Sequence, residues 1–345
     1  MKRYPIWPVA LLVLAGCRHA GTASAEKPAE PTPIPNMSGF ALAQPVQSGN
    51  LAVVPVIYER KAIDKDDYAT LAEALKHDWI EVIEMPNGEV NTLRVRNKGP
   101  KPILLLGGEL LVGGKQDRVV AQDVVIQPGQ TVEVEVDCVE HGRWTGMSNE
   151  FKGGATTVPM RVREEAQFGT QSGVWDRVGE FNEQAKAASG VTTIRGGLAN
   201  ETIQKRIGTD LGRLCSALRE QRNVVGVIIA VDGKPRTLEV FGSPALFDAS
   251  MEEILKGAIA DVALDERQDA SLPSQADCQS FFNDCLNSQR RRSATGEGFN
   301  LFRADAANVH GVELGGRDYE AKAGAAPEGL VHASYSNGSR SDTRR

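Results

Sequence analysis

The chain has 345 residues, with 39 Lys and Arg against 45 Asp and Glu, a formal net charge of −6 at pH 7. This acidity, and the lack of a basic stripe with interleaved aromatic residues, argue against nucleic acid as a partner. With 41% hydrophobic and 24% charged residues, the chain can build a proper core, in one large domain or two closely packed ones.

The first residues have the pattern of an export signal. Lys2 and Arg3 precede an apolar run over residues 6–16, which is shorter than the about 20 residues that a membrane-spanning helix needs. The run ends in the motif LAGC, which matches a lipobox and predicts a lipid on Cys17. The alternative is an ordinary signal peptide with a chance cysteine. We expect a lipoprotein of the cell envelope, anchored to a membrane and facing the periplasm or the exterior.

The chain then divides by composition. Residues 1–16 are the predicted signal peptide, and residues 17–38, rich in Pro, Ala and charge, are predicted to form a disordered tether. Residues 39–336 are predicted to form the folded domain, strand-rich over 50–150 and mixed over 151–336. A polar, disordered tail over 337–345 follows.

Four cysteines remain after Cys17, at positions 138, 215, 278 and 285, and an oxidising compartment would permit any of three pairings. Cys278 and Cys285 are seven residues apart in an expected helix. This separation places their Cα atoms about 10 Å apart, too far for a disulfide. The five histidines are scattered and never spaced i, i+4, so we expect no structural metal and no cofactor.

The strand-rich half predicts an antiparallel β-sandwich. The pattern favours strands over residues 51–58, 80–84, 90–96, 103–106 and 131–138, with only residues 67–77 helical. The second half changes character. Helical spacing covers residues 174–188, 201–222, 243–264 and 275–288, and Asp232-Gly233 predicts a hairpin between two strands. Further strands are expected near residues 299–302, 311–314 and 330–334. The basic run at residues 290–292 is interpreted as a solvated helix end. The fold class is therefore α+β, and the final strands could return to the first sheet.

Two polar segments interrupt this core-building pattern. In the first, two glycine pairs bracket Glu109, and the cluster Lys115, Gln116, Asp117 and Arg118 follows. Glycines permit the close approach of a ligand or of another strand. Arg161 and Arg163, near Gln167, belong either to the same site or to the surface.

The second segment, residues 139–144, follows the strand over 131–138 and holds Glu140, His141, Arg143 and Trp144. Arg143 offers a planar fork for carboxylate or phosphate, Trp144 a stacking face, and the acids a general base. The structural alternative is that Glu109 pairs with Arg118 or Arg143 and that Trp144 is core. We predict that the two segments meet around one pocket.

Three stretches resemble one known family: residues 107–120 (GGELLVGGKQDRVV), 123–144 (DVVIQPGQTVEVEVDCVEHGRW) and 225–247 (VGVIIAVDGKPRTLEVFGSPALF). The family is the domain named for its association with ADP-ribosylglycohydrolases and rhodanese-phosphatases, and the resemblance extends from about residue 40 to 335. Its signature steps fall here on Gly108-Glu109, on Gln116-Asp117-Arg118 and on residues 140–144. The name implies a genomic link to ADP-ribose or phosphorylated ligands, which is an association and not a mechanism.

Three functions compete. The first is a ligand-binding domain whose pocket takes a sugar or a phosphorylated, ADP-ribose-like compound, bound by residues 115–118, His141, Arg143 and Trp144. The second is a hydrolase of a glycosidic or phosphoester bond, with Glu109 and Glu140 as acid and base. The third is a structural or interaction module. Buried and fully paired side chains would favour the third.

Overall fold

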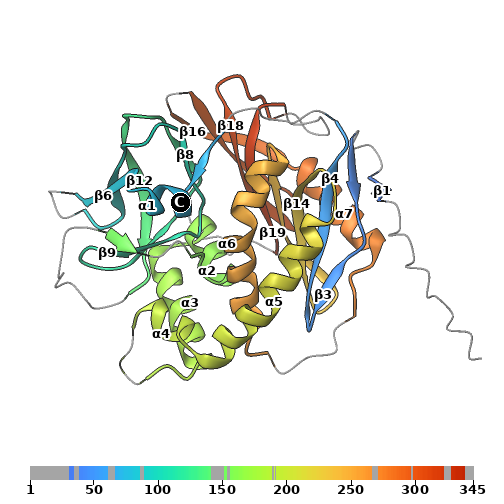
Figure 1. Cartoon of the computed structure of the whole chain (residues 1–345), viewed down its shortest axis with the longest axis horizontal. Coiled ribbons are helices and arrows are strands. Elements are labelled where there is room, and N and C mark those ends of the chain that lie inside the picture. Colours follow the sequence, from blue (N-terminus) through green and yellow to red (C-terminus); the bar gives the residue numbers. More distant parts are fainter. Residues whose placement is uncertain are drawn as a thin grey trace, which may run out of the picture. The chain divides into compact units, whose positions relative to one another are not determined.

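The computed structural model describes residues 31–34, 39–60, 67–85, 89–140, 151–153, 156–188, 190, 192–265, 271–296, 298–321 and 328–338. These residues form an α+β fold whose N-terminal half is rich in sheet, which confirms the predicted fold class (Figure 1). Cys17 and the predicted signal peptide lie outside the described residues. Among the described residues, no helix is both long and apolar enough to cross a membrane.

A ten-stranded antiparallel sheet joins segments from both halves of the chain. Its order is β1-β2-β4-β14-β15-β19-β18-β17-β16, with β3 paired to β4. Because β4 pairs with β14, and β15 pairs with β19, the final strands of the chain join the sheet that contains the N-terminal strand β4. The strands are β1 (Thr32–Pro33), β2 (Phe40–Leu42), β3 (Val46–Ser48), β4 (Leu51–Tyr58), β14 (Val224–Val231), β15 (Lys234–Phe241), β16 (Gln289–Gly296), β17 (Phe299–Asp305), β18 (Val309–Gly316) and β19 (Leu330–Asn337).

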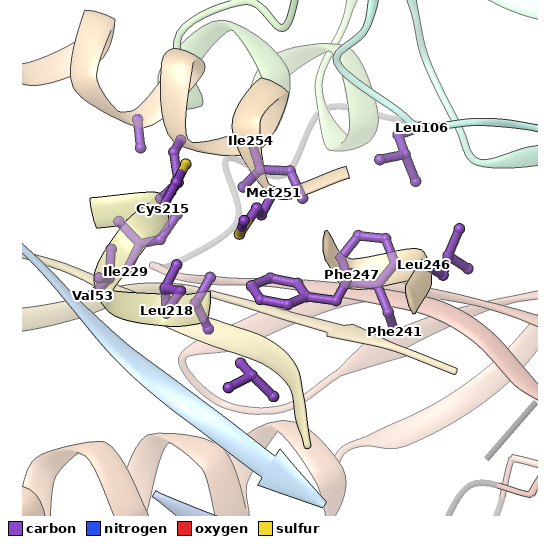
Figure 2. Close-up of a cluster of buried hydrophobic side chains, with 14 of the residues drawn as sticks. Val53, Leu106, Cys215, Leu218, Ile229, Phe241, Leu246, Phe247, Met251 and Ile254 are labelled. Atoms are coloured by element: carbon purple, nitrogen blue, oxygen red, sulfur yellow. The ribbon is translucent and has the colours of Figure 1, made fainter. Parts of the chain in front are cut away.

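Helices cover both faces of this sheet. On one face lie α5 (Glu201–Arg219) and α6 (Pro244–Val262), which run across β14 and β19 in Figure 1. Figure 2 shows part of the core beneath them, where Leu218 of α5 and Met251 of α6 meet strand residues such as Ile229. The opposite face packs on α7 (Gln275–Leu286). Since both faces are covered, β4 is apolar along its whole length and does not alternate.

Two smaller sheets enclose a separate core. The six-stranded sheet has the order β13-β9-β10-β12-β7-β6, and the three-stranded sheet has the order β11-β8-β5. Residues of both sheets, such as Val134 and Ile103, share this core, as the sandwich prediction requires. The elements are β5 (Ala69–Thr70), α1 (Leu71–Lys76), β6 (Ile80–Glu84), β7 (Thr92–Asn97), β8 (Ile103–Leu105), β9 (Leu110–Gly113), β10 (Arg118–Val120), β11 (Val124–Ile126), β12 (Thr131–Cys138) and β13 (Phe151–Gly153).

A third group of helices connects the sandwich to α5 and α6. It consists of α2 (Met160–Phe168), α3 (Gln171–Gln184) and α4 (Ile194–Leu198). Their buried side chains pack on Leu110 and Val119 of the sandwich and on Ile203 of α5. Leu106, directly after β8, reaches the core beneath α5 and α6 as well (Figure 2). With these contacts, the described residues from Pro31 onward belong to one compact unit.

Local signals predicted several elements well. The strands over 51–58, 80–84 and 131–138 have the predicted bounds, and Asp232 and Gly233 both have the positive φ that their hairpin turn requires. Ser243 caps α6 by accepting a hydrogen bond from the Leu246 backbone N–H at 3.2 Å. The predicted helix containing Cys278 and Cys285 is α7, and the four described cysteines are free thiols.

The interpretation of the basic run at 290–292 as a helix end was wrong. The run lies in β16, which pairs with β17. Arg291 and Arg292 are exposed, but the Arg290 guanidinium is buried against Glu313, with Nη2 2.8 Å from Oε1. Tyr319 donates a further hydrogen bond to Glu313 at 2.8 Å, and Tyr335 donates another. Near the end of the predicted tether, Thr32–Pro33 pair with β2 and Ile34 is buried.

Candidate functional site

The first polar segment packs tightly against α2. Gly108 has φ +95°, and a Cβ added to it would lie 2.5 Å from Cγ of Arg163. A Cβ on Gly107 would lie 2.5 Å from Nε2 of Gln167. Glycine is therefore required here for the approach of a helix. Whether the segment also contacts a ligand stays a prediction.

Glu109 lies beneath the surface with 3% of its area exposed. Its Oε2 accepts a hydrogen bond from the Leu106 backbone N–H at 2.8 Å. Burial, with Glu253 and Asp123 nearby, raises the pKa of Glu109 to about 8, so the side chain is a neutral acid at pH 7.

The Gln116-Asp117-Arg118 step is also buried, and it fastens neighbouring elements together. Arg118 is 0% exposed, donates to the Gln116 carbonyl at 2.8 Å and lies 3.7 Å from Oε1 of Glu84. Asp117 accepts hydrogen bonds from the Gly113 backbone N–H at 3.0 Å and from Nε of Arg195 at 2.6 Å. These contacts are consistent with a structural role for Gln116, Asp117 and Arg118.

Lys115 is only half-buried, and its backbone N–H donates to Glu84 at 2.9 Å. This hydrogen bond involves only the backbone, so the role of the Lys115 side chain in ligand binding stays a prediction.

The second polar segment meets the first in part. Arg118 is paired with Cys138 across β10 and β12, and Nε2 of Gln116 donates to the Glu140 carbonyl at 2.9 Å. Glu140 is buried and forms a β-bridge with Thr193. His141, Arg143 and Trp144 lie outside the described residues. The structure therefore joins Gln116–Arg118 to Glu140, whereas Glu109 contacts a different set of partners.

A buried ionic chain lies beside Glu109, and the sequence analysis did not identify it. Nδ1 of His332 is 2.5 Å from Oδ2 of Asp123, and its Nε2 is 3.0 Å from Oε2 of Glu239. Glu239 in turn accepts from both terminal nitrogens of Arg163, at 2.7 and 3.1 Å. We call these four residues the ionic chain. Asp123 follows the sandwich strand β10, and His332 and Glu239 lie on the large sheet. Arg163 lies on α2. The ionic chain therefore links the sandwich, the large sheet and the helix α2.

The charges alternate along the ionic chain. Burial favours the neutral form of each group, but the neighbouring opposite charges outweigh it. Burial alone would lower the pKa of His332, yet Asp123 and Glu239 raise it to about 9. The pKa of Asp123 and of Glu239 is lowered despite burial, by His332 and by Arg163 together with His332 respectively. At pH 7 the residues are therefore carboxylate, imidazolium, carboxylate and guanidinium.

A single kind of signal could have revealed the ionic chain: a charged residue within an apolar strand. Each of the two residues lies between buried apolar neighbours in its strand: Leu238 and Val240 flank Glu239, and Val331 and Ala333 flank His332. Such a residue must find a partner, because an unpaired buried charge is too costly. The sequence does not say which partner, since Asp123 and His332 are 209 positions apart.

Above the ionic chain lies a cleft of about 690 Å³ between the sandwich and the large sheet. Phe299, Leu301 and Leu314 of the large sheet form an apolar wall. The facing wall is the wet side of β12 and the segment before β11, with polar side chains at Gln122, Gln130, Thr131, Glu133 and Glu135. Asp123 belongs to both the cleft lining and the ionic chain, with its side chain beneath the surface.

The cleft is acidic. Among its described lining residues there is no Lys, Arg or His. Glu133 and Glu135 are exposed and lie two positions apart on one face of β12, and Nε2 of Gln122 donates to Oε2 of Glu135 at 2.6 Å. Within the described ranges, no group of three or more His, Cys, Asp or Glu side chains is arranged to hold a metal ion.

The described residues thus form a single α+β domain with a cleft where its sheets meet. The family model for the ARG and Rhodanese-Phosphatase-superfamily-associated Protein domain, ARPP-1, matches residues 39–335, and the chain belongs to this family. No curated protein and no solved structure is significantly similar to the chain.

Proposed function

We propose that this protein is a lipoprotein of the cell envelope, anchored through Cys17, whose domain binds a neutral sugar in the cleft above the ionic chain. The observation that carries the proposal is the pairing of two unlike walls in one cleft of about 690 Å³. Ligand pockets of 300–1,000 Å³ with an apolar surface and a few polar groups are typical of small-molecule sites.

The two walls suit the two faces of a sugar ring. The hydroxyl groups of a sugar can donate to the carboxylates of Glu133 and Glu135 and exchange hydrogen bonds with the amides of Gln122 and Gln130. The C–H face of the ring can pack on Phe299 and Leu301. Carboxylates accept hydrogen bonds more strongly than neutral groups do, so they favour a hydroxyl-rich ligand.

A phosphorylated ligand fits this cleft less well. Its negative charge would face Glu133 and Glu135, and no cation is present among the described lining residues. Like charges at close range disfavour binding. Of the two predicted ligand classes, we therefore propose the neutral sugar and not the phosphorylated compound.

The roles of Glu109 and Glu140 as acid and base stay predictions. Both side chains are buried, and neither lines the cleft in which the sugar is proposed to bind. Analysis of the saccharide after incubation with the protein separates binding from hydrolysis, because hydrolysis releases new reducing ends.

Neutral saccharides are expected to raise the melting temperature of the full chain. The measurement is a thermal-shift screen of glucose, N-acetylglucosamine and their short oligomers, followed by calorimetric titration of the best ligand. Glu133→Ala should weaken that ligand about tenfold or more, since a hydrogen bond to a charged group contributes about 1.5–3 kcal/mol. The matched control is Glu220→Ala, an exposed glutamate on another part of the surface, which should bind as the unchanged protein does. Equal affinity in Glu133→Ala, or stabilisation by sugar phosphates alone, would contradict the proposal.

The anchor has a separate test. Cys17→Ser is expected to move the protein from the membrane fraction to the soluble fraction and to abolish labelling by an alkyne fatty acid. Cys215→Ala, which changes a described buried thiol, should keep both the label and the membrane location. A Cys17→Ser variant that still sediments with membranes and takes up label would refute the predicted lipid site.

A further inference from the structure

A second hollow, separate from the cleft, lies where α2, α3, β15 and β18 meet. Its volume is about 360 Å³, and it shares no lining residue with the cleft. Half of its lining residues are charged: Arg161, Glu164 and Glu165 of α2, Arg177 of α3 and Arg236 of β15, with His310 of β18 beside them. We call it the arginine hollow.

The acidic residues of the arginine hollow are already engaged. Oε1 of Glu165 accepts a hydrogen bond from the Thr170 backbone N–H at 3.0 Å. A Cβ on Gly169 or Gly173 would lie only 1.7 or 2.0 Å from that oxygen, so these glycines let Glu165 fold back onto the start of α3. Oε1 of Glu164 lies 3.1 Å from Nε2 of buried His310. Both carboxylates also attract the Arg177 guanidinium, although the oxygens named here already have other partners.

Both ring nitrogens of His310 have an oxygen partner. Nε2 faces Glu164, and Nδ1 lies 3.2 Å from the Gly338 carbonyl oxygen. The contact with His310 therefore occupies one oxygen of Glu164.

The arginines differ in how many donors they have left. Arg161 is held in place, since Nε donates to Asp261 at 2.8 Å, Nη2 to the Asp261 carbonyl at 2.9 Å and Nη1 to Gln184 at 3.2 Å. Arg177 uses only Nη1, which donates to Glu180 at 2.8 Å. Arg236 makes no hydrogen bond or ion pair with any described residue. Two guanidinium groups with unused donors therefore line one hollow from different elements.

We infer that the arginine hollow binds a small anion that carries a phosphate group. Guanidinium groups bind phosphate through pairs of charge-assisted hydrogen bonds. Donors that arrive from α3 and from β15 approach from different directions, which suits a tetrahedral oxyanion better than a planar carboxylate. Arg161 is fixed by Asp261, which also offsets its charge, so Arg161 shapes the hollow without needing to move. This inference is independent of the sugar proposal, because the two sites have no residue in common.

The test is calorimetric titration of inorganic phosphate into the full chain at constant ionic strength, with chloride as the background anion. We expect saturable binding of one phosphate, weakened about tenfold or more by either Arg236→Gln or Arg177→Gln. Arg94→Gln is the matched control, because Arg94 is also an exposed arginine on a strand and likewise has no bonded partner among the described residues. It should bind phosphate as tightly as the unchanged chain.

The outcomes separate cleanly. No saturable phosphate binding, full affinity in Arg236→Gln, or an equal loss in Arg94→Gln would each overturn the inference. Tighter binding of succinate than of phosphate would also overturn it, since the site would then be a carboxylate site. Melting curves of the variants check folding, and all three should match the unchanged chain because their side chains are exposed. Sugar titration of Arg236→Gln should be normal, which distinguishes failure here from failure of the cleft proposal.

Discussion

Replacing Glu239 with glutamine is expected to destabilise the domain by about 3–5 kcal/mol at pH 7. Glu239 is 0% exposed and is the only carboxylate described as bonded to the Arg163 guanidinium. Glutamine keeps the shape but removes the negative charge, so Arg163 becomes a buried cation without a counter-charge and His332 retains only Asp123. Urea unfolding of the full chain, followed by circular dichroism, measures the change.

A matched control and a double variant make this prediction specific. Glu220→Gln removes an exposed glutamate and should change the unfolding free energy by no more than about 0.5 kcal/mol. Arg163→Met combined with Glu239→Leu should cost less than the sum of the two single changes, because removing both charges leaves no unpaired ion. Strict additivity, or a loss below about 1 kcal/mol in Glu239→Gln, would show that the ionic chain does not hold the layers together.

Replacing Glu109 with glutamine is expected to stabilise the protein in alkaline solution. The folded-state pKa of Glu109 is raised from 4.5 to about 8, chiefly by burial. Between these two pH values the folded state binds more protons than the unfolded state, so the unfolding free energy falls as pH rises. The loss is complete above about pH 8 and amounts to roughly 3–5 kcal/mol. Glutamine resembles the protonated acid and escapes this loss.

The measurement is urea unfolding of both proteins from pH 4.5 to 9. The two should be nearly equal at pH 4.5, and the glutamine variant should be the more stable by roughly 3–5 kcal/mol at pH 9. His332, whose folded pKa is about 9 against an ordinary 6.5, adds a loss of stability between these values to both proteins. That shared loss cancels in the difference. A glutamine variant that is less stable at every pH would mean that Glu109 serves the fold as a carboxylate.

These two predictions bear on the meaning of the family signature. Gly108, Glu109, Gln116, Asp117 and Arg118 are buried, and their contacts join strands to helices. This is the outcome that the structural interpretation of these residues requires. Among the described residues, the two proposed sites, in the cleft beside Asp123 and in the arginine hollow, lie outside the signature steps. His141, Arg143 and Trp144 of the third step lie outside the described residues.

The sequence alone determined much of the local structure. The residue pattern predicted β12 with its observed bounds, Asp232-Gly233 predicted a hairpin, and helical spacing from residue 243 predicted α6. Each of these signals depends on backbone conformation and side-chain spacing within a few residues. The same signals missed α2, because Arg163 and Gln167 are polar residues on the buried side of that helix.

Tertiary structure alone decided the pairings and the hollows. Nothing local indicates that β4 lies beside β14, that Asp123 bonds to His332, or that Glu133 and Phe299 line one cleft. A charged residue in an apolar strand shows that a partner is needed, but the choice of partner depends on which strands become neighbours. Burial of Gln116–Arg118 was hidden for the same reason: polarity is a property of the residue, whereas exposure is set by what packs over it.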